Sequence, residues 1–198
     1  MNKFFKLLCI IVVVNGCHKP CNEPDYNFTV FESFSPERDS MNIGDTLYLN
    51  CEIPKMEKDI NTGQVINFSK LGNLGDNLVI SNISKFHDAK REAADSFSYF
   101  NIYGKIYSDN NGAKQFQFME TDSSYRLKVG LILLKAGSYV LTIPDATGIY
   151  RNGHVKCGVG NYAVLNSNVN KHLYLFEDLW GPIISTYDRN RSYCIKVK

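Results

Sequence analysis

Alternating apolar and polar residues form a series of short runs after residue 25. In the run Thr46–Ile53, apolar or aromatic side chains occupy every second position from Leu47, and Cys51 is in phase with them. The run Ser124–Leu134 carries one ring and four aliphatic side chains on a single face: Tyr125, Leu127, Val129, Leu131 and Leu133. A period of two is typical of strands with one face in a core. We therefore predict strands over both runs, and a further strand over Tyr26–Phe31.

Two pairs of runs are predicted to form hairpins. The runs 102–107 and 115–120 flank Ser108-Asp109-Asn110-Asn111-Gly112, whose residue types favour turns. The runs 124–134 and 138–143 are joined by Lys135-Ala136-Gly137, and Pro144 ends the second of them. Helical character is confined to 85–95, where alanines stand among charged residues. Many short strands with one short helix predict a mainly β fold, an antiparallel β-sandwich.

Two segments resemble strands of immunoglobulin-like domains in secreted bacterial proteins. They are Ile43-Gly44-Asp45-Thr46-Leu47-Tyr48-Leu49 and Ala136-Gly137-Ser138-Tyr139-Val140-Leu141. The resemblance implies an immunoglobulin-like sandwich, although the order Cys, Trp, Cys of such domains is absent because the one tryptophan is Trp180. The chain has 198 residues, more than the roughly 100 of one such domain. We predict one elaborated domain over 26–198, with a boundary at 54–63 as the alternative.

The first residues predict export and a lipid anchor. Lys3 and Lys6 precede the apolar run Leu7–Val14, which is too short to span a bilayer because a span needs about 20 residues. The sequence Val14-Asn15-Gly16-Cys17 resembles the lipobox of a bacterial lipoprotein signal, apart from the less usual Asn15. The resemblance implies removal of residues 1–16, lipid on Cys17 and a tether over 17–25. It places the domain at the outer membrane, facing the periplasm or the cell surface; a plain cleaved signal is the alternative.

An oxidising compartment favours disulfides among the cysteines that follow Cys17. These four are Cys21, Cys51, Cys157 and Cys194. A bridge between Cys157 and Cys194 would tie the last strand to a glycine-rich loop. Cys51 is in phase with a core face, so it either pairs with Cys21 or stays a buried thiol.

Charge and motifs narrow the chemistry. The chain carries a formal +2, and loss of Lys3 and Lys6 with the leader brings this to zero, which argues against nucleic-acid binding. Three motifs are absent from the sequence: the Gly-x-Ser-x-Gly motif of serine hydrolases, the His-Glu-x-x-His motif of zinc proteases and the Gly-x-x-x-x-Gly-Lys loop that binds phosphate. The pair His154 and Cys157 is half of a zinc site, and Asp109 with Asn111 fits a turn better than a calcium loop. We expect neither a metal nor a cofactor.

The segment Phe97–Tyr107 is the best candidate for a recognition surface. If it is extended, Phe100, Ile102 and Ile106 share a core face, and Tyr99, Tyr103 and Tyr107 share the opposite face. Exposed rings could stack on a glycan or anchor an envelope protein. Trp180 is either a contact residue in a loop or a plug on one end of the sandwich. We predict a non-catalytic binding or assembly module; the alternative is a small envelope hydrolase acting on glycans.

Overall fold

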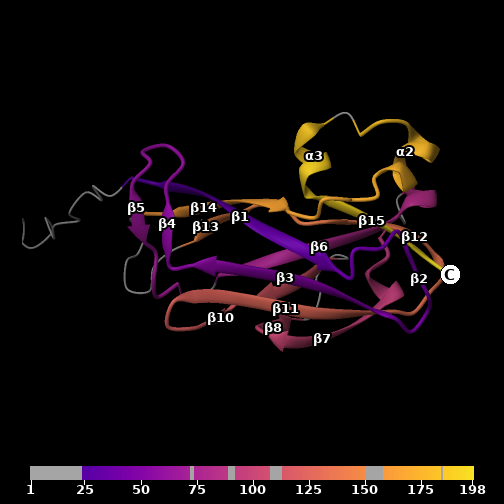
Figure 1. The fold of residues 1–198 in the computed structure, drawn as a ribbon, viewed down its shortest axis with the longest axis horizontal. Helices are drawn as coiled ribbons and strands as arrows, with labels where there is room; N and C mark the ends of the chain where they lie inside the picture. The colour runs from indigo at the N-terminus through magenta and orange to yellow at the C-terminus, as the bar shows by residue number, and fades with distance from the viewer. Residues whose placement is uncertain (1–23, 72–73, 89–91, 108–112, 150–157, 184) are drawn as a thin grey trace, which may run out of the picture.

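The protein folds as a β-sandwich, two sheets packed face to face (Figure 1). The computed structural model describes residues 24–71, 74–88, 92–107, 113–149, 158–183 and 185–198. The first sheet contains β1 (Tyr26–Ser35), β3 (Thr46–Pro54), β7 (Phe97–Tyr103), β10 (Met119–Glu120), β11 (Ser124–Leu133), β13 (Ala146–Ile149) and β14 (Gly160–Asn166). The second contains β2 (Ser40–Met41), β6 (Gly75–Asn82), β8 (Lys105–Tyr107), β9 (Ala113–Gln117), β12 (Gly137–Thr142) and β15 (Ser192–Val197).

Short elements complete the described chain. The strands β4 (Met56–Lys58) and β5 (Val65–Asn67) form a separate hairpin, seen at the left end of Figure 1. Two 3₁₀ turns, η1 (Ile83–Lys85) and η2 (Ala94–Ser96), precede β7. The helices α2 (Tyr174–Trp180) and α3 (Thr186–Arg191) lie over the second sheet, just before β15. No helix of the described residues has the length and apolarity that crossing a membrane requires.

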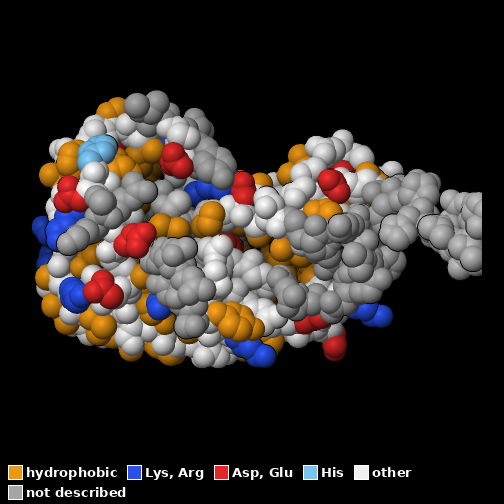
Figure 2. All heavy atoms as spheres, turned by 180° about the vertical axis from the view of Figure 1, so that it is seen from behind, with side chains coloured by type: hydrophobic (Ala, Val, Ile, Leu, Met, Phe, Trp, Pro, Cys, Tyr) orange, Lys and Arg blue, Asp and Glu red, His pale blue; other side chains and the backbone are white. Residues whose placement is uncertain are grey.

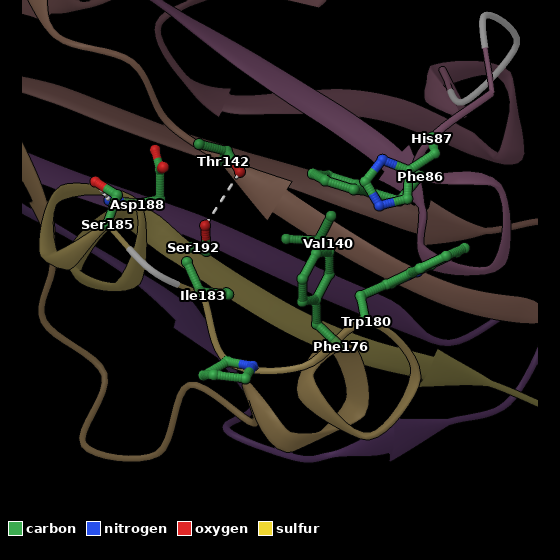
Figure 3. Close-up of a pocket in the computed structure, with 11 residues that line it drawn as sticks. Phe86, His87, Val140, Thr142, Phe176, Trp180, Ile183, Ser185, Asp188 and Ser192 are labelled. Atoms are coloured by element: carbon green, nitrogen blue, oxygen red, sulfur yellow. Dashed lines mark hydrogen bonds between the residues drawn. The ribbon is translucent and has the colours of Figure 1, made fainter.

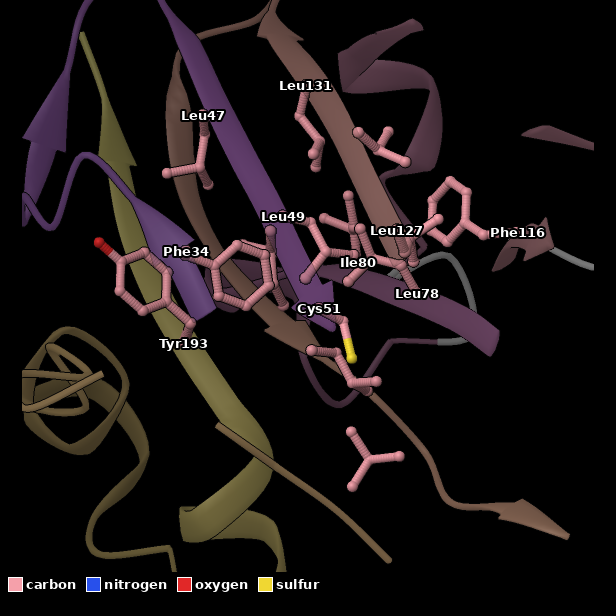
Figure 4. Packing of buried hydrophobic residues seen from close by; sticks show 14 of the residues in the cluster. Phe34, Leu47, Leu49, Cys51, Leu78, Ile80, Phe116, Leu127, Leu131 and Tyr193 are labelled. Carbon is pink, nitrogen blue, oxygen red and sulfur yellow. The ribbon is translucent and has the colours of Figure 1, made fainter. Parts of the chain in front are cut away.

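The alternating runs become core strands as predicted. Figure 4 shows Leu47 and Leu49 of β3 with Leu131 and Leu127 of β11, and Leu78 and Ile80 of β6 from the other sheet. Each of these side chains is at most 1% exposed. Burial of an aliphatic side chain contributes roughly 1.5–3 kcal/mol, so the two inner faces hold the sandwich together. The strand predicted over 26–31 continues to Ser35.

One predicted hairpin is confirmed in its inner part, and the other is wrong. β8 pairs antiparallel with β9, although the turn at 108–112 lies outside the described residues. β11 and β12 do not pair: β11 bonds to β3, β7 and β10, whereas β12 bonds to β6 and β15. Both strands contribute apolar side chains to the main core. The link 134–136 takes the chain from the first sheet to the second, so the two strands face each other across the core and do not pair edge to edge. The sheets are also mixed, because β1 pairs with β14, and β15 with β2, in parallel.

The helix predicted over 85–95 is wrong for its described part. Glu92 forms an isolated antiparallel bridge with Ser81, and the Ala93 amide donates to the Ile80 carbonyl oxygen at 2.9 Å. The backbone there is bonded to the edge of β6, so it is unavailable for helical bonds. The small alanines allow this close approach and are buried.

The two cysteines of the described chain are free thiols. Cys51 faces the main core, as its phase predicts, and Cys194 is completely buried under α2. Cys17, Cys21 and Cys157 lie outside the described residues. The expected bridge between Cys157 and Cys194 therefore has no support in the structure.

Candidate ligand pocket

A cavity of about 410 Å³ lies between the helical segment and the outer face of the second sheet (Figure 3). Its walls come from the end of η1, from α2 and α3, and from the strands β12 and β15. The described residues that line it are Phe86, His87, Val140, Thr142, Phe176, Trp180, Pro182, Ile183, Ser185, Asp188 and Ser192. A volume of this size is in the usual range of small-ligand pockets.

The floor of the pocket is a second, small hydrophobic core. Val140 of β12 and Cys194 of β15 are register partners whose side chains point away from the main core. Ile83 and Phe176 pack on them. The outer face of a β-sandwich is usually polar, but here it carries apolar side chains that the helical segment covers. Burial raises the pKa of the Cys194 thiol to about 12, so it stays protonated and is no nucleophile at neutral pH.

Aromatic rings form one wall of the pocket. Phe86 meets Phe176 edge to face, with ring centroids 4.6 Å apart, and His87 meets Trp180 in the same way at 4.6 Å. The indole Nε1 of Trp180 donates to the Ile83 carbonyl oxygen at 2.6 Å, which fixes the ring at the end of α2. Gly181 then ends the helix at φ +80°, a conformation that favours glycine.

Hydroxyl groups gather at the opposite wall. Figure 3 shows Thr142 and Ser192 joined by a hydrogen bond of 3.2 Å, with Ser185 and Asp188 beyond them. The Ser185 hydroxyl oxygen accepts the Asp188 amide at 3.4 Å and so begins α3. The pocket therefore has an apolar, aromatic side and a hydrogen-bonding side. Such a division fits a ligand with an apolar body and one polar end.

The tyrosine face predicted over 97–107 is not one continuous strand face, although Tyr99 and Tyr107 line a common recess on the surface. β7 belongs to the first sheet and β8 to the second, and the chain turns between them at Gly104 with φ +88°. Tyr103 and Tyr107 are exposed on different sheets, whereas Tyr99 is half-buried and donates its hydroxyl to the Ala94 carbonyl oxygen at 3.0 Å.

Among the side chains predicted on the core face of this segment, Ile106 packs against the main core as predicted. Phe97, which is in phase with Tyr99, is buried in the core. Phe100 and Ile102, predicted in the core, are exposed. The pairing of β7 with β11 shifts by one residue between Lys128 and Val129, and this irregularity leaves Ile102 without a register partner. Because a shift of one residue exchanges the two faces of a strand, Tyr103 lies on the face of Phe100 and not on that of Tyr99.

Two buried acidic residues were missed by the sequence reasoning. Glu32 of β1 is fully buried, and Asp76 of β6 is nearly so. Burial, and then the negative charge of Asp76, raise the pKa of Glu32 well above its ordinary value. Burial also raises the pKa of Asp76 to about 6. A signal exists in the sequence, since Glu32 is in phase with Val30 and Phe34, and Asp76 with Leu74 and Leu78.

No metal site emerges from the described part of the chain. It contains no group of three His, Cys, Asp or Glu side chains able to hold a metal ion. Glu120 is paired with Lys55 at 2.8 Å, and Glu177 with Arg189. The candidate ligands His154, Cys157, Asp109 and Asn111 lie outside the described residues.

Comparison with known proteins gives only distant likeness. No protein-family model and no curated protein matches the chain. The human F-spondin reeler domain is similar at a TM-score of 0.42 and 9% identity, over 89% of this chain and 94% of that one. The seventh ScaB type I cohesin from Pseudobacteroides cellulosolvens has a TM-score of 0.33 at 8% identity, over 88% and 92% of the two chains. Likeness at this level says nothing about the function of this chain.

Proposed function

We propose that this protein is a non-catalytic binding module of the bacterial cell envelope, held at the outer membrane by lipid on Cys17. Its pocket receives an apolar side chain of an envelope protein. The basic and apolar leader ending in Gly16-Cys17 supports the anchor. The described domain begins only a short tether after that cysteine, as an anchored module requires.

The observation that carries the binding role is the position of Trp180. Its indole ring borders the cavity and is 41% exposed, although it is held at one edge by a hydrogen bond. A large ring kept partly in water beside an apolar cavity is the usual anchor of a recognition site. A plug would be covered, so the contact role is the better account of this tryptophan.

The arrangement of the rings favours an apolar side chain over a sugar. Sugar binding by stacking needs a flat ring face, but both aromatic pairs at the pocket meet edge to face, at 88° and 89°. The hydroxyl groups of the pocket are confined to one wall, whereas a sugar carries hydroxyls around the whole edge of its ring. A leucine or phenylalanine side chain, with its backbone near Thr142 and Ser192, matches the division of the pocket.

The emission of Trp180 provides the test, because it is the one tryptophan of the chain. Titration with N-acetyl-phenylalaninamide should change the emission saturably, with a Kd on the order of a millimolar for so small a probe. Ile183→Asp, which places a charge in the lining, should abolish the change. Ile43→Asp, at an exposed position outside the lining, should leave it intact. A response unchanged by Ile183→Asp, or the absence of any saturable response, would contradict the proposal.

The hydrolase alternative lacks an observation in its favour. Glycoside hydrolysis requires two carboxyl groups that face each other across the substrate. Among the described residues that line the pocket, Asp188 is the one acidic side chain. The buried pair Glu32 and Asp76 lies in the interior of the sandwich, where a glycan has no access.

A further inference from the structure

The hairpin β4–β5 exposes three large apolar side chains at one end of the molecule. Met56, Ile60 and Val65 are 55%, 56% and 61% exposed. Met56 pairs with Asn67 and Lys58 with Val65, so Met56, Lys58 and Val65 share one face of the hairpin. Ile60 lies in the connecting turn. We call these four side chains the hairpin tip.

The tip is held firmly against the beginning of β1. The Asp59 carboxylate is buried and accepts hydrogen bonds from the backbone N–H groups of Asn27 and Thr62, each at 2.8 Å. The Ile60 amide donates to the Asn27 carbonyl oxygen at 2.8 Å. On the opposite face of the hairpin, Ile66 packs against the main core. The exposure of the tip is therefore built into the fold beside the point where the chain enters the domain.

The length of the preceding chain places this end of the domain near the membrane. The step from Cys17 to Tyr26 covers nine residues, which span at most about 30 Å when fully extended. If Cys17 carries lipid, as proposed above, the beginning of β1 stays within that distance of the bilayer surface. The hairpin tip lies at the same end of the long axis, and the helices over the pocket lie toward the other (Figures 1 and 2).

We propose that the hairpin tip inserts into the lipid interface of the membrane to which Cys17 is anchored. Met56, Ile60 and Val65 supply the apolar area, and the Lys58 ammonium on the same face meets anionic headgroups while its aliphatic stem lies along the apolar side chains. Lys58 forms no ion pair within the described residues, so its charge is available for this contact. This contact orients the domain, and the pocket then faces away from the bilayer.

Quenching by brominated lipids tests the contact in the full chain. The protein, expressed with its leader, is reconstituted into phosphatidylethanolamine and phosphatidylglycerol vesicles with brominated acyl chains. In a Trp180→Phe background, Val65→Trp places the one tryptophan at the tip. Val169→Trp is the matched control, because Val169 is 98% exposed and follows Asn168, which is bonded to Phe34 near the far end of β1. Thermal unfolding checks that both variants are folded.

The proposal predicts that the Val65→Trp emission loses more than half of its intensity and shifts to the blue, whereas the Val169→Trp emission hardly changes. Mass spectrometry of the same samples reports the acyl chains on Cys17. Equal quenching at both positions, or none at position 65, in acylated protein would overturn the tip contact and leave the anchor standing. Absence of acyl chains would overturn the anchor itself, and the reason for placing the tip at a membrane would fall with it.

Discussion

Glu32 and Asp76 bring two carboxyl groups into the interior of the sandwich, beside the Cys51 thiol. Burial raises both pKa values, and for Glu32 the charge of its neighbour adds to the effect. Hydrogen bonds with Glu32 and with the backbone N–H of Asn77 lower the pKa of Asp76, the charge of Asp145 raises it, and that of Arg191, which is ion-paired with Asp145, lowers it. A buried carboxyl group is most stable in its neutral form, so ionisation works against the fold.

This arrangement makes the stability of the domain fall as the pH rises. In the unfolded chain Asp76 loses its proton near its ordinary value of 3.8, but in the folded domain it does so near 6. The unfolded state therefore binds fewer protons between these values, and the free energy of unfolding decreases over about pH 4 to 6, by an amount on the order of a few kcal/mol. Glu32 extends the decrease to higher pH. Urea unfolding at a series of pH values measures it.

Asp76→Asn supplies the control for this prediction. An amide oxygen still accepts the backbone N–H of Asn77 but does not titrate, so the decrease between pH 4 and 6 should become smaller, and the part that comes from Glu32 should remain. Asp95→Asn, at an exposed ion pair with Lys135, removes a carboxyl group whose pKa is lowered, so it should leave the decrease in place. A wild-type stability that rises between pH 4 and 6 would contradict the account.

At the scale of elements, the chain crosses from one sheet to the other between β7 and β8. Gly104 makes this turn at φ +88°, and a Cβ atom there would lie 2.5 Å from the Gln117 carbonyl oxygen and 2.9 Å from Leu127 Cδ1. Gly104→Ala therefore combines backbone strain with a clash against the backbone of β9. We expect a loss of about 3 kcal/mol in the free energy of unfolding.

Gly44→Ala separates the two causes. Gly44 has nearly the same φ, +89°, but a Cβ atom there meets nothing within 4 Å. Its loss should be limited to backbone strain, about 1 kcal/mol. Equal losses for the two alanine variants in denaturant unfolding would show that the close contact at the crossing contributes nothing.

The strands could be predicted because each is indicated by the alternation of apolar and polar residues within its own segment. In the runs 46–53 and 124–134, the side chains that are buried are the alternate apolar ones that the sequence pattern indicates. The crossing at Gly104 and the irregular pairing of β7 depend on partners far along the chain, which local periodicity does not report. The alanines at 93 and 94 indicate a helix in isolation, but contact with β6 decides their conformation. The pocket was missed for the same reason, since its walls come together only after the sheets have paired.

At the scale of the whole molecule, the fold separates two surfaces along its long axis. The hairpin tip and the beginning of β1 lie at one end, and the helices that cover the pocket lie toward the other (Figure 1). In the space-filling view these two ends rise as separate lobes, with hydrophobic side chains exposed on both (Figure 2). An anchored module that presents its binding site away from the membrane needs this separation.

If an envelope partner binds at the pocket beside Trp180, photocrosslinking in intact cells should detect it. A photoreactive amino acid replaces His87, which is exposed at the pocket and touches Trp180. We expect a discrete adduct with one envelope protein, which disappears when Ile183→Asp is added and does not form from position 169. An adduct that survives Ile183→Asp, or that forms equally from position 169, would contradict binding at this pocket.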